Sequence, residues 1–309
     1  MTQHDFDVVI IGGGPAGLSS ALWCSELGLS ALLLESGDGL GGQLNRVFNP
    51  IENHLGVSAE NGKKLLDIFL TQIETRDFER KMNSEVSAVD LEAGSVKLLS
   101  GEDVNFLNLI IATGVRRRTL DVPGIEDFIG RGILFSGKRD GESVRNKSVV
   151  VAGGGDAAFE NALILAETAD KVVLIHRSSK FRAREEFVTQ VSSHPKIQIR
   201  TAAEITKVLG NKALHSLEIR DSSTGNTSIL ETDALLVRIG VVPNTELFSG
   251  KLKLDAGNYI VINDLCETSM PRIFAVGDVS NPVSPTVSSA VGAGATAVKT
   301  IAAKYSLSC

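Results

Sequence analysis

The feature that most constrains this 309-residue chain is an internal repeat of strand, glycine turn, helix and strand. One copy begins at Val8 and reads VVIIGGGPAGLSSALWCSELGLSALLLES, and the other begins at Val149 and reads VVVAGGGDAAFENALILAETADKVVLIHR. About ten of the 29 aligned positions are identical. In each copy apolar β-formers precede the glycines, a stretch of helical length follows them, and a second apolar run closes the unit. Two such units predict an α/β protein with parallel sheets.

The glycine turns have small residues where a dinucleotide needs them. Gly12 permits the tight turn, Gly14 lets the backbone approach a pyrophosphate, and Gly17 lets the helix pack closely on the strand. The second copy keeps Gly153 and Gly155 and has alanine in the third place. The pyrophosphate is expected at the helix N-terminus, where free N–H groups favour an anion. Glycine turns also occur in proteins that bind nothing, but two copies in full context favour two dinucleotide sites.

The ends of the two copies distinguish the ligands. Glu35 ends the first copy, where a carboxylate accepts hydrogen bonds from ribose hydroxyls. His176 and Arg177 stand at the matching place in the second copy, and Arg182 follows. These groups would attract a ribose 2′-phosphate, and each charge-assisted hydrogen bond contributes about 1.5–3 kcal/mol. We therefore predict FAD in the first site and NADPH in the second. The alternative is that the cations only decorate a solvated loop.

Composition excludes several other classes of protein. Hydrophobic residues make up 43% of the chain and charged residues 22%, which is too apolar for a disordered chain. The net charge of −6 argues against a nucleic-acid binder. Apolar runs fall short of the about 20 residues that a membrane span needs, and the N-terminus does not resemble a signal peptide. Cys24, Cys266 and Cys309 are too scattered for a disulfide framework or a zinc site, so we predict a cytoplasmic protein with no metal.

Further motifs resemble the low-molecular-weight thioredoxin reductases and the related thioredoxin-reductase-like ferredoxin–NADP reductases, over essentially the whole chain. The motifs are Gly41-Gly42-Gln43-Leu44, Ala112-Thr113-Gly114, Val122-Pro123-Gly124, Gly240 followed by Pro243-Asn244-Thr245, and Ala275-Val276-Gly277-Asp278-Val279. The resemblance implies two Rossmann-like domains, each with three layers (ββα), and a homodimer. The FAD domain would comprise residues 1–115 and 245–309, and the NADPH domain, residues 116–244, would be inserted between them.

The resemblance also implies which residues contact each cofactor. For FAD these are Gly12, Gly14, Pro15, Ala16, Gly17, Glu35, Gly42, Gln43, Leu44, Asn53, Ala112, Thr113, Gly114, Gly277, Asp278, Pro285, Thr286 and Val287. For NADPH they are Gly153, Gly154, Gly155, Asp156, Ala157, His176, Arg177, Arg182, Ile239 and Gly240.

One segment departs from the family. Thioredoxin reductases carry Cys-x-x-Cys-Asp-Gly in the NADPH domain, and residues 136–141 of this chain read SGKRDG. Ser136 and Arg139 stand in place of the two cysteines, whereas Asp140 is retained. Serine cannot replace a redox cysteine, because the reaction needs reversible S–S bond formation. We therefore predict no certain catalytic side chain and no internal disulfide relay. Cys24 and Cys266 are expected to be buried, and Cys309 is a lone thiol at the last position.

The last helix is expected to begin with Ser284 as the N-cap and Pro285 as its first residue, and to run through Val287 to Lys304. The resemblance implies that the N-terminus of this helix points at the flavin, with Pro285 and Thr286 where the family usually has Arg-Gln. His54 is expected to be structural.

The predicted function is that of a flavoprotein oxidoreductase in which NADPH gives a hydride to FAD, and a non-thioredoxin acceptor takes the electrons. The acceptor would be a small redox protein such as ferredoxin or flavodoxin, or a small molecule such as a quinone. Three alternatives stay open. The chain could be a nucleotide-binding module without turnover, or a thiol–disulfide enzyme that uses Cys309 or cysteines of a partner. The second site could also take another nucleotide, even a second flavin, because Ser178 stands where the family usually has a further arginine.

Overall fold

The computed structural model describes residues 4–305, and these divide into two compact units. One unit is formed by the residues up to Arg116 together with those from Val242 on, and the other by Arg117–Val241. The chain passes between the units through β7 (Val115–Arg117) and β16 (Val241–Pro243), which pair as a two-stranded sheet. The second unit is therefore an insertion in the first.

The first unit contains a sheet in the order β3-β2-β1-β6-β5-β4, with β17 also paired to β6. Strands β3, β2, β1, β6 and β17 are parallel, and β4 and β5 add an antiparallel meander. The strands span Phe6–Ile11 (β1), Ala31–Leu34 (β2), Glu79–Lys81 (β3), Val86–Asp90 (β4), Ser95–Leu98 (β5), Asp103–Ile111 (β6) and Ile273–Ala275 (β17).

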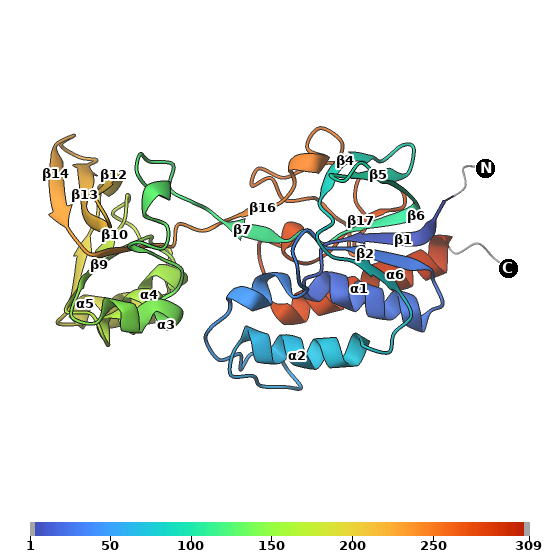
Figure 1. The fold of residues 1–309 in the computed structure, drawn as a ribbon, viewed down its shortest axis with the longest axis horizontal. Coiled ribbons are helices and arrows are strands. Elements are labelled where there is room, and N and C mark those ends of the chain that lie inside the picture. The colour runs from blue at the N-terminus through green and yellow to red at the C-terminus, as the bar shows by residue number, and fades with distance from the viewer. Residues whose placement is uncertain (1–3, 306–309) are drawn as a thin grey trace. The chain divides into compact units, whose positions relative to one another are not determined.

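Alternation of apolar side chains gives this unit three layers. Val8 and Ile10 of β1 point to one face, where they pack under α1 (Pro15–Glu26), α2 (Gly62–Ile73) and α6 (Val287–Tyr305). Val9 and Ile11 point to the other face, where they meet the meander. Figure 1 shows these three helices below the sheet and the meander above it. Because both faces are covered, β1 reads as a continuous apolar run.

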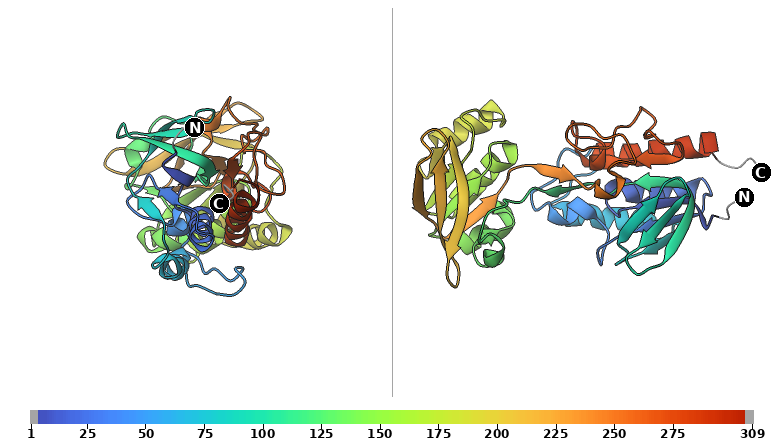
Figure 2. Two further views of the ribbon diagram at one scale, coloured as in Figure 1. Left: turned by 90° about the vertical axis from the view of Figure 1, so that its right-hand side faces the viewer. Right: turned by 90° about the horizontal axis from the view of Figure 1, so that it is seen from above.

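The second unit repeats this plan. Its parallel sheet has the order β11-β10-β9-β15-β8. Helices cover one face and a three-stranded antiparallel sheet, β12-β13-β14, covers the other (Figure 2). The strands are Ile133–Leu134 (β8), Ser148–Ala152 (β9), Lys171–Ile175 (β10), Ile197–Arg200 (β11), Ala203–Gly210 (β12), Leu214–Asp221 (β13), Thr227–Glu231 (β14) and Ala234–Val237 (β15), and the helices are Gly137–Asp140 (α3), Asp156–Ala166 (α4) and Glu185–Ser193 (α5). The expected α/β fold of two three-layer Rossmann-like units is confirmed.

Short 3₁₀ helices complete both units. They span Gly42–Arg46 (η1), Glu126–Phe128 (η2), Gly141–Val144 (η3), Glu246–Phe248 (η4) and Gly277–Val279 (η5). Within residues 4–305, no helix combines the length and apolar character that a bilayer crossing requires.

The expected start of the last helix is wrong by two residues. The hydroxyl of Thr286, not that of Ser284, accepts the capping hydrogen bond, from the Ser289 amide at 3.2 Å. The Ser289 hydroxyl accepts from the Thr286 amide at 3.3 Å, so the two residues cap each other. Ser284 instead belongs to a turn in which its amide donates to the Asn281 side chain. Helix α6 therefore begins at Val287, and Pro285 precedes the cap.

Candidate functional site

The candidate site of the first unit is a cleft of about 860 Å³ where β1, β2 and β6 end. The carboxyl edge of a parallel sheet is where α/β proteins bind ligands. All the residues predicted to contact FAD line this cleft except Gly17 and Asn53. Gly17 lies behind the turn, and Asn53 is exposed to solvent outside the cleft.

At each glycine of the first turn, a different contact or conformation explains why no side chain is present. A Cβ on Gly12 would lie 2.4 Å from the Ala112 carbonyl oxygen, and Gly12 has a φ of +109°. A Cβ on Gly17 would lie 1.9 Å from the Gly12 carbonyl oxygen, so this glycine lets the helix and the turn pack closely. At Gly14 the nearest atom is Gly42 Cα, at 3.9 Å. The space in front of Gly14 therefore opens into the cleft, as backbone approach by a pyrophosphate requires.

Glu35 holds a fixed carboxylate at the edge of the cleft. Its Oε2 accepts a hydrogen bond from the Gly13 amide at 2.8 Å, and its Oε1 accepts one from the Gly37 amide at 2.8 Å. These two bonds hold the carboxylate between the glycine turn and the loop that follows β2. Oε1 also accepts from the Ser36 hydroxyl at 3.2 Å, whereas Oε2 retains acceptor capacity, which suits the ribose hydroxyls predicted from the sequence.

A second carboxylate, that of Asp278, also lines the cleft. Asp278 is in η5, and burial raises the pKa of its carboxyl group above the ordinary 3.8. Among residues 4–305 no side chain or amide donates a hydrogen bond to it. A half-buried carboxylate without a protein donor is free to accept hydrogen bonds from the hydroxyl groups of a ligand. The open space at Gly14 and the acceptor at Asp278 together fit the pyrophosphate and the polyol chain of FAD.

Side-chain hydrogen bonds hold other segments that line the cleft. The side chain of Gln43 donates to the Val115 carbonyl at 2.6 Å. Thr113 and Asn244 bond each other twice, through Thr113 Oγ1 to the Asn244 carbonyl at 2.8 Å and Asn244 Nδ2 to the Thr113 carbonyl at 2.7 Å. His54 Nδ1 lies 3.0 Å from the Ser288 hydroxyl on the first turn of α6. This contact ties a loop to the helix.

Sequence reasoning missed one wall of the cleft, formed by Ser84, Glu85 and Val86. These residues follow β3, and the Ser84 amide donates to the Glu35 carbonyl at 2.8 Å. Strand β3 reads Glu-Arg-Lys and lacks the apolar pattern of a buried strand. The sequence therefore did not predict a strand here or place the segment after it at the cleft.

The glycine turn of the second unit follows the same rules. A Cβ on Gly153 would lie 2.2 Å from the Arg238 carbonyl oxygen, and its φ is +152°. A Cβ on Gly155 would have no protein atom within 4 Å, so the space in front of this glycine is open. The His176 ring lies against Gly154, 2.4 Å from where a Cβ would be. His176 therefore covers the middle glycine, as Glu35 bonds the middle glycine of the first turn.

The surroundings of His176 disfavour the positive charge that would attract a phosphate. Burial lowers the pKa of His176, the bond from its ring to the Lys180 carbonyl opposes this, and the charges of Arg177 and Arg182 lower it further. Together these effects favour the neutral imidazole. It packs against Gly154 and against the ring of Phe181, with the ring centroids 5.7 Å apart.

The two arginines lie on an exposed loop that is anchored to the turn. The amides of Arg182 and Ala183 donate to the Gly154 carbonyl at 2.7 and 3.2 Å. Arg177 and Arg182 both expose their side chains. Asp156 at the start of α4 accepts two hydrogen bonds from Arg184, one from its amide at 2.8 Å and one from its Nε at 2.9 Å.

The other residues predicted for NADPH are Ala157 in the first turn of α4, and Ile239 and Gly240 just after β15. The Ala157 carbonyl accepts from Asn161 Nδ2 at 2.7 Å. Ile239 is half-buried and packs on the core beneath the antiparallel sheet. The Gly240 carbonyl accepts from the Arg118 amide at 2.9 Å.

In the SGKRDG turn, Asp140 makes hydrogen bonds that hold the local backbone. Asp140 Oδ2 accepts from the amides of Phe135 and Ser136, at 2.5 and 3.0 Å. Its Oδ1 pairs with Arg139 Nε at 3.0 Å. Ser136 is buried and lies just before α3. The aspartate therefore has a structural role in this turn.

Neither described cysteine is a reactive thiol. Burial, with a smaller contribution from Asp7, raises the pKa of Cys24 to about 12. Burial also raises the pKa of Cys266 to about 11. Both thiols stay protonated at neutral pH, and the thiolate is the nucleophile in disulfide exchange. Cys309 lies outside the described residues. Among residues 4–305 no group of three or more His, Cys, Asp or Glu side chains is placed to hold a metal ion.

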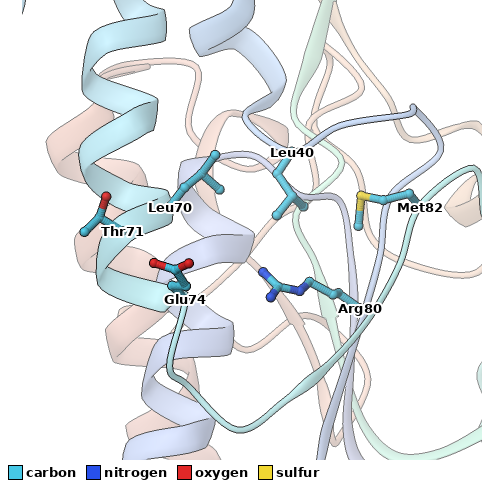
Figure 3. Close-up of a pocket in the computed structure, with 6 residues that line it drawn as sticks. All are labelled: Leu40, Leu70, Thr71, Glu74, Arg80 and Met82. Carbon is cyan, nitrogen blue, oxygen red and sulfur yellow. The ribbon is translucent and has the colours of Figure 1, made fainter.

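A second pocket in the first unit, about 460 Å³, holds none of the predicted residues (Figure 3). Glu74 at the end of α2 and Arg80 of β3 point toward one another across it. Leu40, Leu70 and Met82 supply apolar walls.

Comparison with known proteins gives a consistent result. The family model described as pyridine nucleotide-disulphide oxidoreductase matches residues 6–297. The thioredoxin reductase of Treponema pallidum is 34% identical over 286 residues, which is 90% of each chain. One component of the alkyl hydroperoxide reductase from Staphylococcus aureus is 32% identical over 96% of this chain, but the match spans only 58% of that protein.

The solved structures show the same relationship. Thioredoxin reductase from Lactococcus lactis superposes with a TM-score of 0.85 at 31% identity, over 97% of this chain and 98% of that one. Thioredoxin reductase from T. acidophilum gives a TM-score of 0.83 at 27% identity, over 97% and 99%. Proteins of this family use FAD and NADPH. The chain therefore belongs to the pyridine nucleotide-disulphide oxidoreductase family, as an FAD- and NAD(P)H-dependent oxidoreductase of the low-molecular-weight thioredoxin-reductase-like class.

Proposed function

We propose that this protein takes hydride from NADPH to FAD and delivers the electrons to an acceptor without a disulfide of its own. The first unit would be the FAD domain and the second the NADPH domain. The observation that carries the proposal is the pairing of two open glycine turns with the lack of any Cys-x-x-Cys in the chain. Both described thiols are also buried and protonated.

The residues of the first unit would bind and orient FAD. Glu35 accepts from the adenosine ribose, Asp278 accepts from the polyol chain, and the backbone at Gly14 faces the pyrophosphate. The first-turn amides of α6 would favour negative charge on the flavin, by about 0.3–1 kcal/mol. The bound cofactors supply the redox chemistry, because a nicotinamide can give a hydride that a flavin accepts, and a flavin can release electrons to an acceptor.

In the second unit Arg177 and Arg182 would bind the 2′-phosphate, and the backbone at Gly155 would face the pyrophosphate. The His176 ring would support the turn without adding charge. Hydride transfer needs alignment of the two rings and no acid or base from a side chain.

The acceptor would be a small redox protein or a small molecule, and the protein would act as a homodimer in the cytoplasm. Thioredoxin reduction by this chain alone is disfavoured, because the relay that it needs would have to come from Cys309 or from a partner. No described contact favours that route over direct reduction of the acceptor.

Anaerobic mixing with NADPH tests the proposal. The yellow flavin absorbance is expected to bleach rapidly with NADPH and to return when a quinone is added, with no thiol present. NADH should bleach it far more slowly at equal concentration. Retention of the yellow colour at saturating NADPH would overturn the proposal and favour a binding module without turnover.

A further inference from the structure

The cleft of the first unit is lined by more negative than positive side chains. The carboxylates that line it are those of Glu35, Asp38, Glu85 and Asp278. Among residues 4–305, the cations that line it are Arg46 and Arg116 alone. The pyrophosphate of FAD is a dianion and would add further negative charge. Because like charges in a partly enclosed site repel, a cation beside the pyrophosphate would offset this cost.

Of the two arginines, Arg116 already has protein partners. Its Nη2 donates to Glu246 Oε1 at 2.6 Å, and its Nη1 donates to Asn244 Oδ1 at 2.8 Å. The side chain of Arg46 is exposed and lines the cleft, and no group among residues 4–305 accepts a hydrogen bond from it or pairs with its charge. Arg46 is therefore the cation that the cleft can offer to a ligand.

The backbone that carries Arg46 is held against the first glycine turn. Arg46 is the last residue of η1, which begins at Gly42. Gly42 Cα lies 3.9 Å from where a Cβ on Gly14 would be. The Gly41 amide donates to the Gly13 carbonyl at 2.8 Å. The start of η1 thus borders the open space in front of Gly14, where the pyrophosphate is expected.

The other end of η1 is held by α2. The Gly62 amide, at the start of α2, donates to the Val47 carbonyl at 2.8 Å. A Cβ on Gly62 would lie 2.0 Å from the Leu44 carbonyl oxygen, so the two segments are in close contact. A 3₁₀ helix rises about 2.0 Å per residue, which places Arg46 about 8 Å along η1 from its first residue. From this fixed turn, a long guanidinium side chain can reach the space in front of Gly14.

We propose that Arg46 binds the pyrophosphate of FAD and is the side chain that offsets its charge. The inference rests on FAD as the occupant of this cleft, as in the proposed function, and adds a charged residue to the backbone donors of the glycine turn. Those donors favour an anion through N–H groups, whereas a guanidinium also supplies a full charge and paired donors. Because Arg46 is exposed, salt should weaken the contact.

Release of FAD from the full-length, FAD-loaded protein tests this contact. The fluorescence of FAD released on dilution gives the Kd. Arg46→Gln should raise the Kd about tenfold or more, because a charge-assisted hydrogen bond is lost. Arg46→Lys keeps the charge and should raise the Kd by no more than about threefold.

The matched control is Arg80→Gln. It removes another exposed arginine of the first unit, one that lines the smaller pocket and not the cleft, and should hold FAD like wild type. Equal Kd values for wild type and Arg46→Gln would overturn the inference and leave the proposed function standing. Wild-type protein that binds no FAD would overturn both.

Salt and the redox potential identify the part of FAD that Arg46 contacts. In about 1 M salt the Kd values of wild type and Arg46→Gln should converge to within about threefold, since the charges are screened. A difference in Kd that persists unchanged at this salt concentration would contradict a charge contact. Arg46→Gln should weaken the binding of oxidised and reduced FAD by the same factor, so the midpoint potential of the flavin should equal that of wild type. A lower potential, with reduced FAD released more readily than oxidised FAD, would place Arg46 beside the isoalloxazine and overturn the assignment.

Discussion

Replacing Arg177 and Arg182 together with glutamine is expected to raise the KM for NADPH about a hundredfold and to leave the KM for NADH within about twofold. Each charge-assisted hydrogen bond to the 2′-phosphate contributes about 1.5–3 kcal/mol, and 1.4 kcal/mol is a factor of ten in affinity. Both side chains are exposed on a loop that backbone bonds hold against Gly154, so their loss should not disturb the turn. Steady-state quinone reduction with each nucleotide measures the effect.

The control for this pair is Arg220→Gln, in the same unit, which should change neither KM. A double variant whose KM values for NADPH and NADH rise by the same factor would show that the arginines support the loop and do not bind the 2′-phosphate. A double variant with no change would show that the cations only decorate a solvated surface.

The second large effect is expected from placing valine at Gly14 or at Gly155, the two glycines with open space in front of them. Gly14→Val should lower the FAD bound after purification to less than about a tenth of wild type, since overlap with the pyrophosphate costs well over 1.4 kcal/mol. Gly155→Val should leave the protein yellow but abolish bleaching by NADPH. Both glycines have extended backbone that valine adopts, and neither has a protein atom within 3.8 Å of a Cβ. The ratio of flavin to protein absorbance and an anaerobic titration report the two losses.

Each variant is the control for the other, because both add the same side chain at the same place in a repeated motif. Circular dichroism should show native secondary structure in both. Full FAD content in Gly14→Val, or loss of FAD in Gly155→Val, would contradict the assignment of the two units.

Much of this fold could be predicted because the repeat encodes it locally. The apolar runs of β1 and β9 and the glycines after them specify strand, turn and helix by short-range physics. Gly12 and Gly17 were predicted for the contacts they make, since nothing larger fits against the Ala112 and Gly12 carbonyl oxygens. Glu35 was found by its offset from the same motif.

What escaped prediction depends on contacts between distant segments. Burial lowers the pKa of His176, and the packing of its ring against Gly154 is a contact that no sequence spacing reveals. Arg117 and Arg238 both donate to the Phe135 carbonyl, which requires segments more than a hundred residues apart in sequence to meet. The N-cap of α6 is Thr286 because Thr286 and Ser289 bond each other reciprocally. The Ser-Pro pair that predicted the N-cap lies only two residues earlier, and sequence patterns rarely resolve a helix boundary to within two residues.

The central claim is that electrons leave the flavin without passing through a thiol of this chain. The measurement that tests it most directly is anaerobic stopped-flow on the variant with Cys24→Ala, Cys266→Ala and Cys309→Ser. We predict that NADPH bleaches the flavin, and that naphthoquinone restores its colour, at rates within about twofold of wild type, because transition-state contacts are unchanged. Bleaching at the normal rate followed by loss of quinone turnover would contradict the account, since it would show that a cysteine carries the electrons onward.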